Sequence, residues 1–198
     1  MRSIRGLLIS VLTATTWGCG RLGSVNPAIQ DSAASFEPQL LGTWSDSASR
    51  ERAVVTQAGP RSYRIQYTDA EGQTLSLLGL LGRNRERFIL DVQPAAEALG
   101  PYEDLVVRLH IPLILDSIGP RIHLAIVEPD TLVQYLRTHP RVIAHFPTRG
   151  VELSAHMGRT PDGVVLTADS PELGQFLATY LQRPGAVSGP VTWIRRSP

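Results

Sequence analysis

Within residues 61–69 apolar and polar side chains alternate, and this alternation constrains the fold more than any other feature of the chain. Tyr63, Ile65 and Tyr67 fall on one face, and the residues between them are polar. A period of two belongs to a β-strand that buries one face. Residues 69–72, Asp-Ala-Glu-Gly, have the composition of a hairpin loop. We therefore predict a half-buried strand that pairs with its neighbour in an antiparallel hairpin.

Short segments of similar character lie on both sides of this strand. Residues 74–81 are apolar on both faces, and after a turn at 82–85 the side chains of Phe88, Leu90 and Val92 share a face. Strands joined by short turns favour an antiparallel meander. Further strands are expected at residues 50–57, 104–115, 121–127, 141–147, 151–157, 164–168 and 191–195.

Two helices are expected among these strands. Pro129 and Asp130 open the first, which ends near His139. Ser170 precedes Pro171, so we expect Ser170 to cap the second helix, whose apolar residues recur at helical spacing. The predicted fold is mostly β: an antiparallel up-and-down barrel or half-barrel with one mid-chain helix and one C-terminal helix.

Residues 1–18 have the composition of a secretory signal peptide. Arg2 and Arg5 supply positive charge, and residues 6–14 form an apolar run too short to span a membrane. Cys19, the only cysteine of the chain, follows directly and has no partner for an internal disulfide. Two interpretations stay open: a site of lipid attachment, or an ordinary cleaved signal followed by an incidental cysteine.

Gly18-Cys19 resembles the processing site of bacterial lipoproteins, in which the cysteine is lipidated and becomes the mature N-terminus. The resemblance implies a membrane anchor at Cys19, and Gly20 after it implies the outer membrane of the cell envelope, with the body facing the periplasm. Each buried CH₂ of an acyl chain contributes about 0.8 kcal/mol to attachment. Residues 19–39 show no periodicity, so we expect a lipidated cysteine with a flexible tether, followed by a single barrel domain at residues 40–198.

The body resembles the lipocalin-like (calycin) barrels, and in particular bacterial lipoproteins of that type. The resemblance rests on Gly42-Thr43-Trp44 at the start of the first strand and on the strand-to-helix step at residues 127–132. It implies that Gly42 lets the backbone enter the strand, that Trp44 plugs one end of the barrel, and that an arginine near the C-terminus packs on the Trp44 ring. Arg195 is the candidate for this contact, and Arg196 is the alternative.

A barrel of this family holds its ligand inside. The candidate ligand-lining residues are the inward aromatic and aliphatic side chains Tyr63, Ile65, Tyr67, Phe88 and Leu90. The same side chains would equally fill the core of a solidly packed barrel or of an open half-barrel. The sequence leaves these alternatives open.

A candidate polar patch lies on two of the later strands. If Leu115 pairs with Pro120 in a hairpin, four basic and imidazole side chains share the face opposite the apolar one, with the two histidines about 7–8 Å apart. This face is either a solvated outer surface or a site for an anionic headgroup. The four residues are Arg108, His110, Arg121 and His123.

Charge and motifs exclude several functional classes. All 19 basic residues are arginines, they are scattered, and the formal net charge is +1, so the chain lacks the basic footprint of a nucleic-acid-binding protein. No glycine-rich phosphate loop, nucleophilic serine motif or close metal-ligand spacing occurs. We expect no enzymatic activity, no metal site and no cofactor.

Two functions are compatible with these features. The first is an envelope lipoprotein, anchored to the membrane by its N-terminal lipid, that binds a small hydrophobic molecule in the barrel. The alternative is a structural or assembly lipoprotein that binds an envelope protein on its surface and has no ligand cavity.

Overall fold

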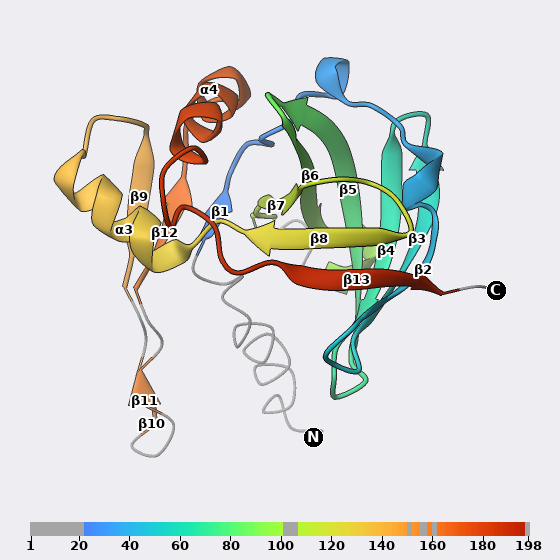
Figure 1. Cartoon of the computed structure of the whole chain (residues 1–198). Coiled ribbons are helices and arrows are strands. Elements are labelled where there is room, and N and C mark those ends of the chain that lie inside the picture. Colours follow the sequence, from blue (N-terminus) through green and yellow to red (C-terminus); the bar gives the residue numbers. More distant parts are fainter. Residues whose placement is uncertain (1–21, 101–106, 150–151, 155–157, 160–161, 197–198) are drawn as a thin grey trace.

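Eight strands of the chain close into an antiparallel barrel (Figure 1). The computed structural model describes residues 22–100, 107–149, 152–154, 158–159 and 162–196. The barrel strands are β2 (Gly42–Asp46), β3 (Arg52–Gly59), β4 (Ser62–Thr68), β5 (Thr74–Asn84), β6 (Arg87–Pro94), β7 (Ile111–Leu115), β8 (Arg121–Ile126) and β13 (Val191–Arg196). Neighbours follow chain order, and β13 pairs with both β8 and β2, which closes the ring. The prediction of an up-and-down barrel is confirmed in its closed form.

The strand predicted from strict alternation is β4. Tyr63 and Ile65 are buried, and Ile65 lies opposite Leu77 of β5 in the expected hairpin. Strand β5 is apolar on both faces for a physical reason. Its inward side chains, such as Leu81, belong to the barrel core, whereas Leu80 points outward and packs against a second core.

Residues 36–41 pack across one end of the barrel. Leu40 is buried there, and the Trp44 indole N–H donates a hydrogen bond to its carbonyl oxygen at 2.9 Å. Phe36 stacks on the ring of Tyr63, with 5.2 Å between the ring centroids. We call this the Trp44 end. The other end, where the loops after β2 and β4 lie, is called the Glu51 end.

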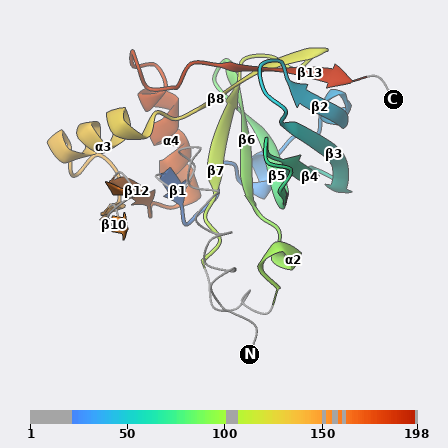
Figure 2. The same cartoon turned by 90° about the horizontal axis from the view of Figure 1, so that it is seen from below.

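A second layer packs against the outside of the barrel (Figure 2). It consists of β1 (Leu22–Ser24), α3 (Pro129–Thr138), β9 (His145–Thr148), β12 (Gly163–Leu166) and α4 (Ser170–Tyr180). The remaining elements are η3 (Asp31–Ala33), η4 (Pro38–Leu40), α2 (Ala96–Leu99), β10 (Glu152–Ser154) and β11 (Gly158–Arg159). Strands β1, β12 and β9 form a three-stranded sheet beside α3 and α4. The strands predicted at residues 141–147, 151–157 and 164–168 therefore exist in part as β9, β10 and β12, but all three lie outside the barrel.

The core of this second layer explains why parts of the barrel wall are apolar on the outside. Ile89, Ile114 and Ala125 point outward from the barrel and are buried in one cluster with Leu173 and Leu177 of α4. Burying apolar surface contributes roughly 25 cal/mol per Å². The barrel and the second layer therefore stabilise each other.

Both predicted helices are present, as α3 and α4. The expected cap of α4 is wrong by one residue: the Asp169 side chain accepts a hydrogen bond from the Glu172 backbone N–H at 2.9 Å, and Ser170 is already helical. Either residue type can cap, so the pattern alone does not choose between them. No helix within the described parts of the chain combines the length and apolarity needed to cross a membrane.

Residues 22–39 do not form the flexible tether that we expected. Leu22 pairs with Val164 at the start of the parallel β1–β12 ladder, and Ala28 and Ile29 are buried. Ile29 packs so closely on Gly82 that a Cβ there would lie 2.6 Å from its side chain. The segment lacks periodicity because backbone hydrogen bonds and a few apolar side chains hold it, not a long regular element.

Candidate functional site

All five candidate lining residues belong to the core inside the barrel. Tyr63 is fully buried, and its hydroxyl accepts a hydrogen bond from the Glu37 backbone N–H at 2.6 Å. Ile65 and Leu90 are also buried, whereas Tyr67 and Phe88 are partly exposed. The structure therefore brings these side chains together in the barrel.

The barrel interior is tightly packed around Gly79 and has partly exposed apolar side chains toward both ends. Around Gly79 it is tight, because an added Cβ would lie 3.1 Å from Leu90 and 3.3 Å from Ile65. Toward the Glu51 end, several apolar side chains of the same core keep part of their surface exposed. These side chains are Tyr67, Leu77, Ile111, Leu113, Leu124 and Val191.

Two carboxyl groups, those of Asp46 and Glu51, lie at the Glu51 end. The Asp46 backbone N–H donates to the Glu51 carbonyl at 3.1 Å, which places the two residues opposite each other across the β2–β3 hairpin. Asp46 is 6% exposed and Glu51 is 1% exposed. Because side chains alternate along a strand, Asp46 shares the inward face of β2 with Trp44. Sequence reasoning missed this pair, although that alternation was visible.

The environment of Glu51 is unfavourable for a negative charge. Burial raises the pKa of its carboxyl, and the neighbouring acids Asp46, Asp69 and Glu71 act in the same direction. A hydrogen bond from the Tyr67 side chain partly opposes this rise in pKa. Oxygen Oε2 of Glu51 is buried without a hydrogen-bond partner among the described residues.

The candidate polar patch is not assembled. Leu115 pairs with Leu124, not with Pro120, so the register differs by four residues from the one that we expected. A shift by an even number leaves each side chain on its face but moves it along the strand. Arg121 and His123 are exposed beside β13, and the His123 ring lies 3.2 Å from the Thr192 hydroxyl. Arg108 precedes β7, and its side chain is partly exposed.

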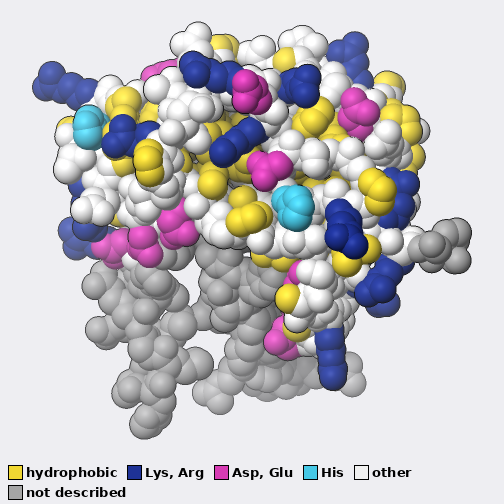
Figure 3. Space-filling model, in the orientation of Figure 1, with side chains coloured by type: hydrophobic (Ala, Val, Ile, Leu, Met, Phe, Trp, Pro, Cys, Tyr) yellow, Lys and Arg dark blue, Asp and Glu magenta, His cyan; other side chains and the backbone are white. Residues whose placement is uncertain are grey.

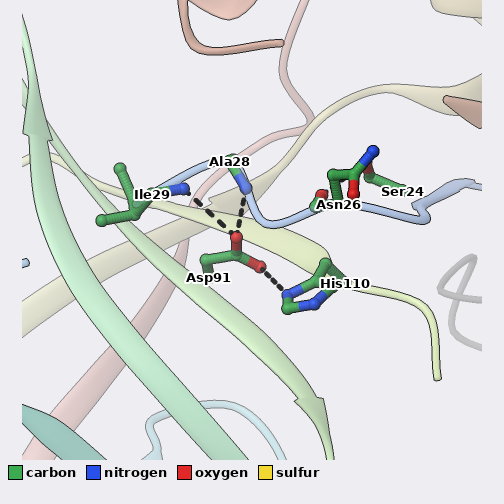
Figure 4. A network of polar contacts seen from close by, with 6 residues as sticks. All are labelled: Ser24, Asn26, Ala28, Ile29, Asp91 and His110. Atoms are coloured by element: carbon green, nitrogen blue, oxygen red, sulfur yellow. Dashed lines mark hydrogen bonds and ion pairs between the residues drawn. The ribbon is translucent and has the colours of Figure 1, made fainter. Parts of the chain in front are cut away.

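His110 belongs instead to a buried polar network on the outer wall of the barrel (Figure 4). Its Nδ1 lies 3.2 Å from Oδ1 of Asp91, a residue that is 2% exposed in the middle of β6. The backbone N–H groups of Ala28 and Ile29 donate to the other carboxylate oxygen. Asp91 therefore holds the N-terminal segment on the barrel.

Backbone pairing reinforces this attachment. The Ser24 N–H donates to the His110 carbonyl at 2.9 Å, and the His110 N–H donates back to the Ser24 carbonyl at 2.8 Å. The side chain of Asn26 donates to the Ala168 carbonyl at 2.9 Å, which ties the same segment to the second layer. The network therefore has a structural role, because it fixes the N-terminal segment to both the barrel and the second layer.

Surface charge indicates no single binding face on the side of the molecule that Figure 3 shows, because basic, acidic and apolar side chains are intermixed there. Among the described residues no group of three or more His, Cys, Asp or Glu side chains is placed to hold a metal ion. Cys19, the candidate lipidation site, lies outside the described residues. In comparisons with known proteins, no family model, no curated protein and no solved structure matches this chain.

Proposed function

We propose that this chain is an envelope lipoprotein that binds a small hydrophobic molecule inside its barrel, through the Glu51 end. The observation that carries the proposal is a group of inward apolar side chains at the Glu51 end that keep part of their surface exposed, among them Tyr67, Leu77 and Leu113. At the Trp44 end, where residues 36–41 pack, four side chains of the same core are also partly exposed: Phe36, Leu41, Phe88 and Ile118. Exposed apolar surface is what a small apolar ligand covers on binding.

Attachment to the membrane is a separate part of the proposal. Its support is the sequence of residues 1–19, with a charged start, a short apolar run and a single cysteine. Metabolic labelling of the expressed chain with a radioactive fatty acid tests it, and Cys19→Ser is the control. Incorporation that is equal in both chains would contradict lipidation at Cys19.

A fluorescent probe tests ligand binding directly. The full chain carrying Cys19→Ser, which removes the proposed acyl group as a competitor, is titrated with N-phenyl-1-naphthylamine. We expect saturable binding at one site. Leu77→Trp, which adds volume to the inner wall, should weaken binding at least about tenfold, because the probe and the indole compete for the same space.

The matched control for that variant is Val54→Trp. Val54 lies on the outer face of β3, where it is 36% exposed. This variant should bind the probe as the parent chain does. Absence of saturable binding in the parent, or equal losses in the two variants, would overturn the proposal.

A protein partner is the second candidate function. It is favoured by Phe146 of β9, which is 65% exposed in the second layer, on a strand that pairs on one side only among the described strands. Large exposed aromatic side chains are enriched at protein interfaces. Crosslinking in the native envelope, compared between the parent chain and Phe146→Ser, tests this candidate.

A further inference from the structure

The carboxyl groups of Asp46 and Glu51 share an apolar and aromatic environment. Trp193 lies directly opposite Asp46 in the β13–β2 ladder and is 8% exposed. The rings of Tyr67 and Trp193 are 6.3 Å apart between centroids, and the Tyr67 side chain hydrogen-bonds Glu51. Two acids and two aromatic rings, from strands β2, β4 and β13 and from the loop before β3, therefore meet at the Glu51 end.

Glu51 is incompletely satisfied in this environment. Glu51 is 1% exposed, and its Oε2 is buried with no hydrogen-bond partner within the described residues. The charged groups that act on it are Asp46, Asp69 and Glu71, all of which are acids. Buried carboxylates are normally paired with a cation or hydrogen-bonded on both oxygens, because an uncompensated buried charge is costly.

The nearest arginines in sequence do not supply the missing partner. Arg50 and Arg52 flank Glu51 and are exposed, and alternation directs their side chains to the side opposite that of Glu51. The unmet requirement at Oε2 is for an N–H donor, preferably one with positive charge. Aromatic faces such as those of Tyr67 and Trp193 also attract cations.

We propose that the barrel takes an organic primary ammonium ion with an apolar tail, and that the ammonium group sits between Glu51, Asp46 and the Tyr67–Trp193 pair. The proposal rests on the proposed ligand-binding function and specifies the class of ligand. The ammonium N–H groups donate to Glu51 Oε2 and to the Asp46 carboxylate, which partly offsets the charge on both acids. The tail lies against inward side chains such as Leu77 and Leu113.

Three probes with the same tail separate the contribution of the head from that of the tail. Dodecylammonium, dodecanol and dodecanoate, each below its micellar concentration, are titrated against the full Cys19→Ser chain at neutral pH, and Trp fluorescence is followed. We expect dodecylammonium to bind at least about tenfold more tightly than dodecanol, and dodecanoate to bind most weakly. Dodecyltrimethylammonium, which has no N–H donor, should bind more weakly than dodecylammonium.

Conservative variants assign the preference to the site. Glu51→Gln should reduce the preference for dodecylammonium over dodecanol to below about threefold while dodecanol affinity stays the same. Asp46→Asn should reduce the preference partly. Glu86→Gln, which alters an exposed acid in the turn between β5 and β6, should preserve it. Circular dichroism confirms that each variant is folded.

The outcomes distinguish the two proposals. Equal binding of the three heads, or a preference for ammonium that survives Glu51→Gln, overturns the ammonium site and leaves the apolar binding function standing. Failure of all the probes to bind the parent chain overturns the binding function and the ammonium site together.

Discussion

The Arg195 guanidinium lies over the ring of Trp44, with 5.0 Å from its central carbon to the ring centroid. The two residues face each other in the β13–β2 ladder, so of the two arginines that the lipocalin resemblance offered, Arg195 makes the contact and Arg196 does not. Arg195→Ala should lower the free energy of unfolding by about 1 kcal/mol through loss of the cation–π contact and of side-chain packing. Urea unfolding measures the change. The control is Arg196→Ala, an exposed neighbour expected to change stability by less than about 0.5 kcal/mol, so equal effects would argue against a special role for Arg195.

Asp91 should be the most sensitive point of the N-terminal segment. Asp91→Ala leaves the N–H groups of Ala28 and Ile29 without their acceptor, and it unpairs His110. We expect a loss of about 3 kcal/mol of unfolding free energy. Hydrogen exchange should show faster exchange at the amides of residues 28 and 29.

The control for Asp91 is Asp116→Ala, because Asp116 is exposed in the turn after β7. This variant should leave both stability and exchange at residues 28 and 29 unchanged. If Asp91→Ala behaves like the control, the network in Figure 4 does not hold the segment.

Tyr180 and Tyr63 should respond in opposite ways to loss of their hydroxyl groups. The Tyr180 hydroxyl is buried with no hydrogen-bond partner among the described residues, and burial raises its pKa to about 12. Tyr180→Phe should therefore leave stability unchanged or raise it by up to about 1 kcal/mol. Tyr63→Phe removes the acceptor of the Glu37 N–H and should cost about 1–2 kcal/mol. Chemical denaturation measures the unfolding free energy of both variants. A larger loss for Tyr180→Phe than for Tyr63→Phe would show that the Tyr180 hydroxyl is the one with a stabilising partner, contrary to this prediction.

Glu51 should make stability depend on pH. Burial raises the pKa of Glu51 in the folded state above its ordinary value of 4.5, so the folded protein holds the proton more tightly than the unfolded chain. The stabilising contribution of the protonated form is complete below about pH 4.5 and is lost as the pH rises through the raised pKa. Relative to Glu51→Gln, the parent chain should lose unfolding free energy between about pH 4 and neutrality. Denaturant titrations across that range measure the difference, and a difference independent of pH would contradict the shift.

The sequence predicted those parts of the fold that depend on local pattern. Two local patterns predicted the central hairpins: the alternation around Tyr63, and the run at residues 74–81 that is apolar on both faces and forms part of β5. A side-chain period of two specifies which face of a strand is buried. Alternation does not specify register. Arg121 and Ile122 of β8 pair with β13 and not with β7, which moves the β7–β8 pairing by four residues.

Long-range contacts account for what the sequence could not predict. Whether β9 and β12 join the barrel or a second sheet depends on partners far away in the chain, such as β1. The five candidate lining residues were foreseeable because inward alternation places them in one core. The burial of Glu51 was not, because a carboxyl beside the serine-rich loop at residues 47–49 has the pattern of a solvated turn.

The folded N-terminal segment has a consequence for how the protein would sit on a membrane. β1 begins at Leu22, and Cys19 precedes it by three residues, which even when fully extended reach only about 11 Å. An acyl anchor on Cys19 would then hold the body against the lipid headgroups, with little freedom to rotate away from them. The direction in which the Glu51 end faces, toward the bilayer or toward the aqueous compartment, would be set by how β1 docks on β12. Exchange of a ligand between the barrel and the membrane would then depend on the direction in which the Glu51 end faces, because so short a link would not let the body turn.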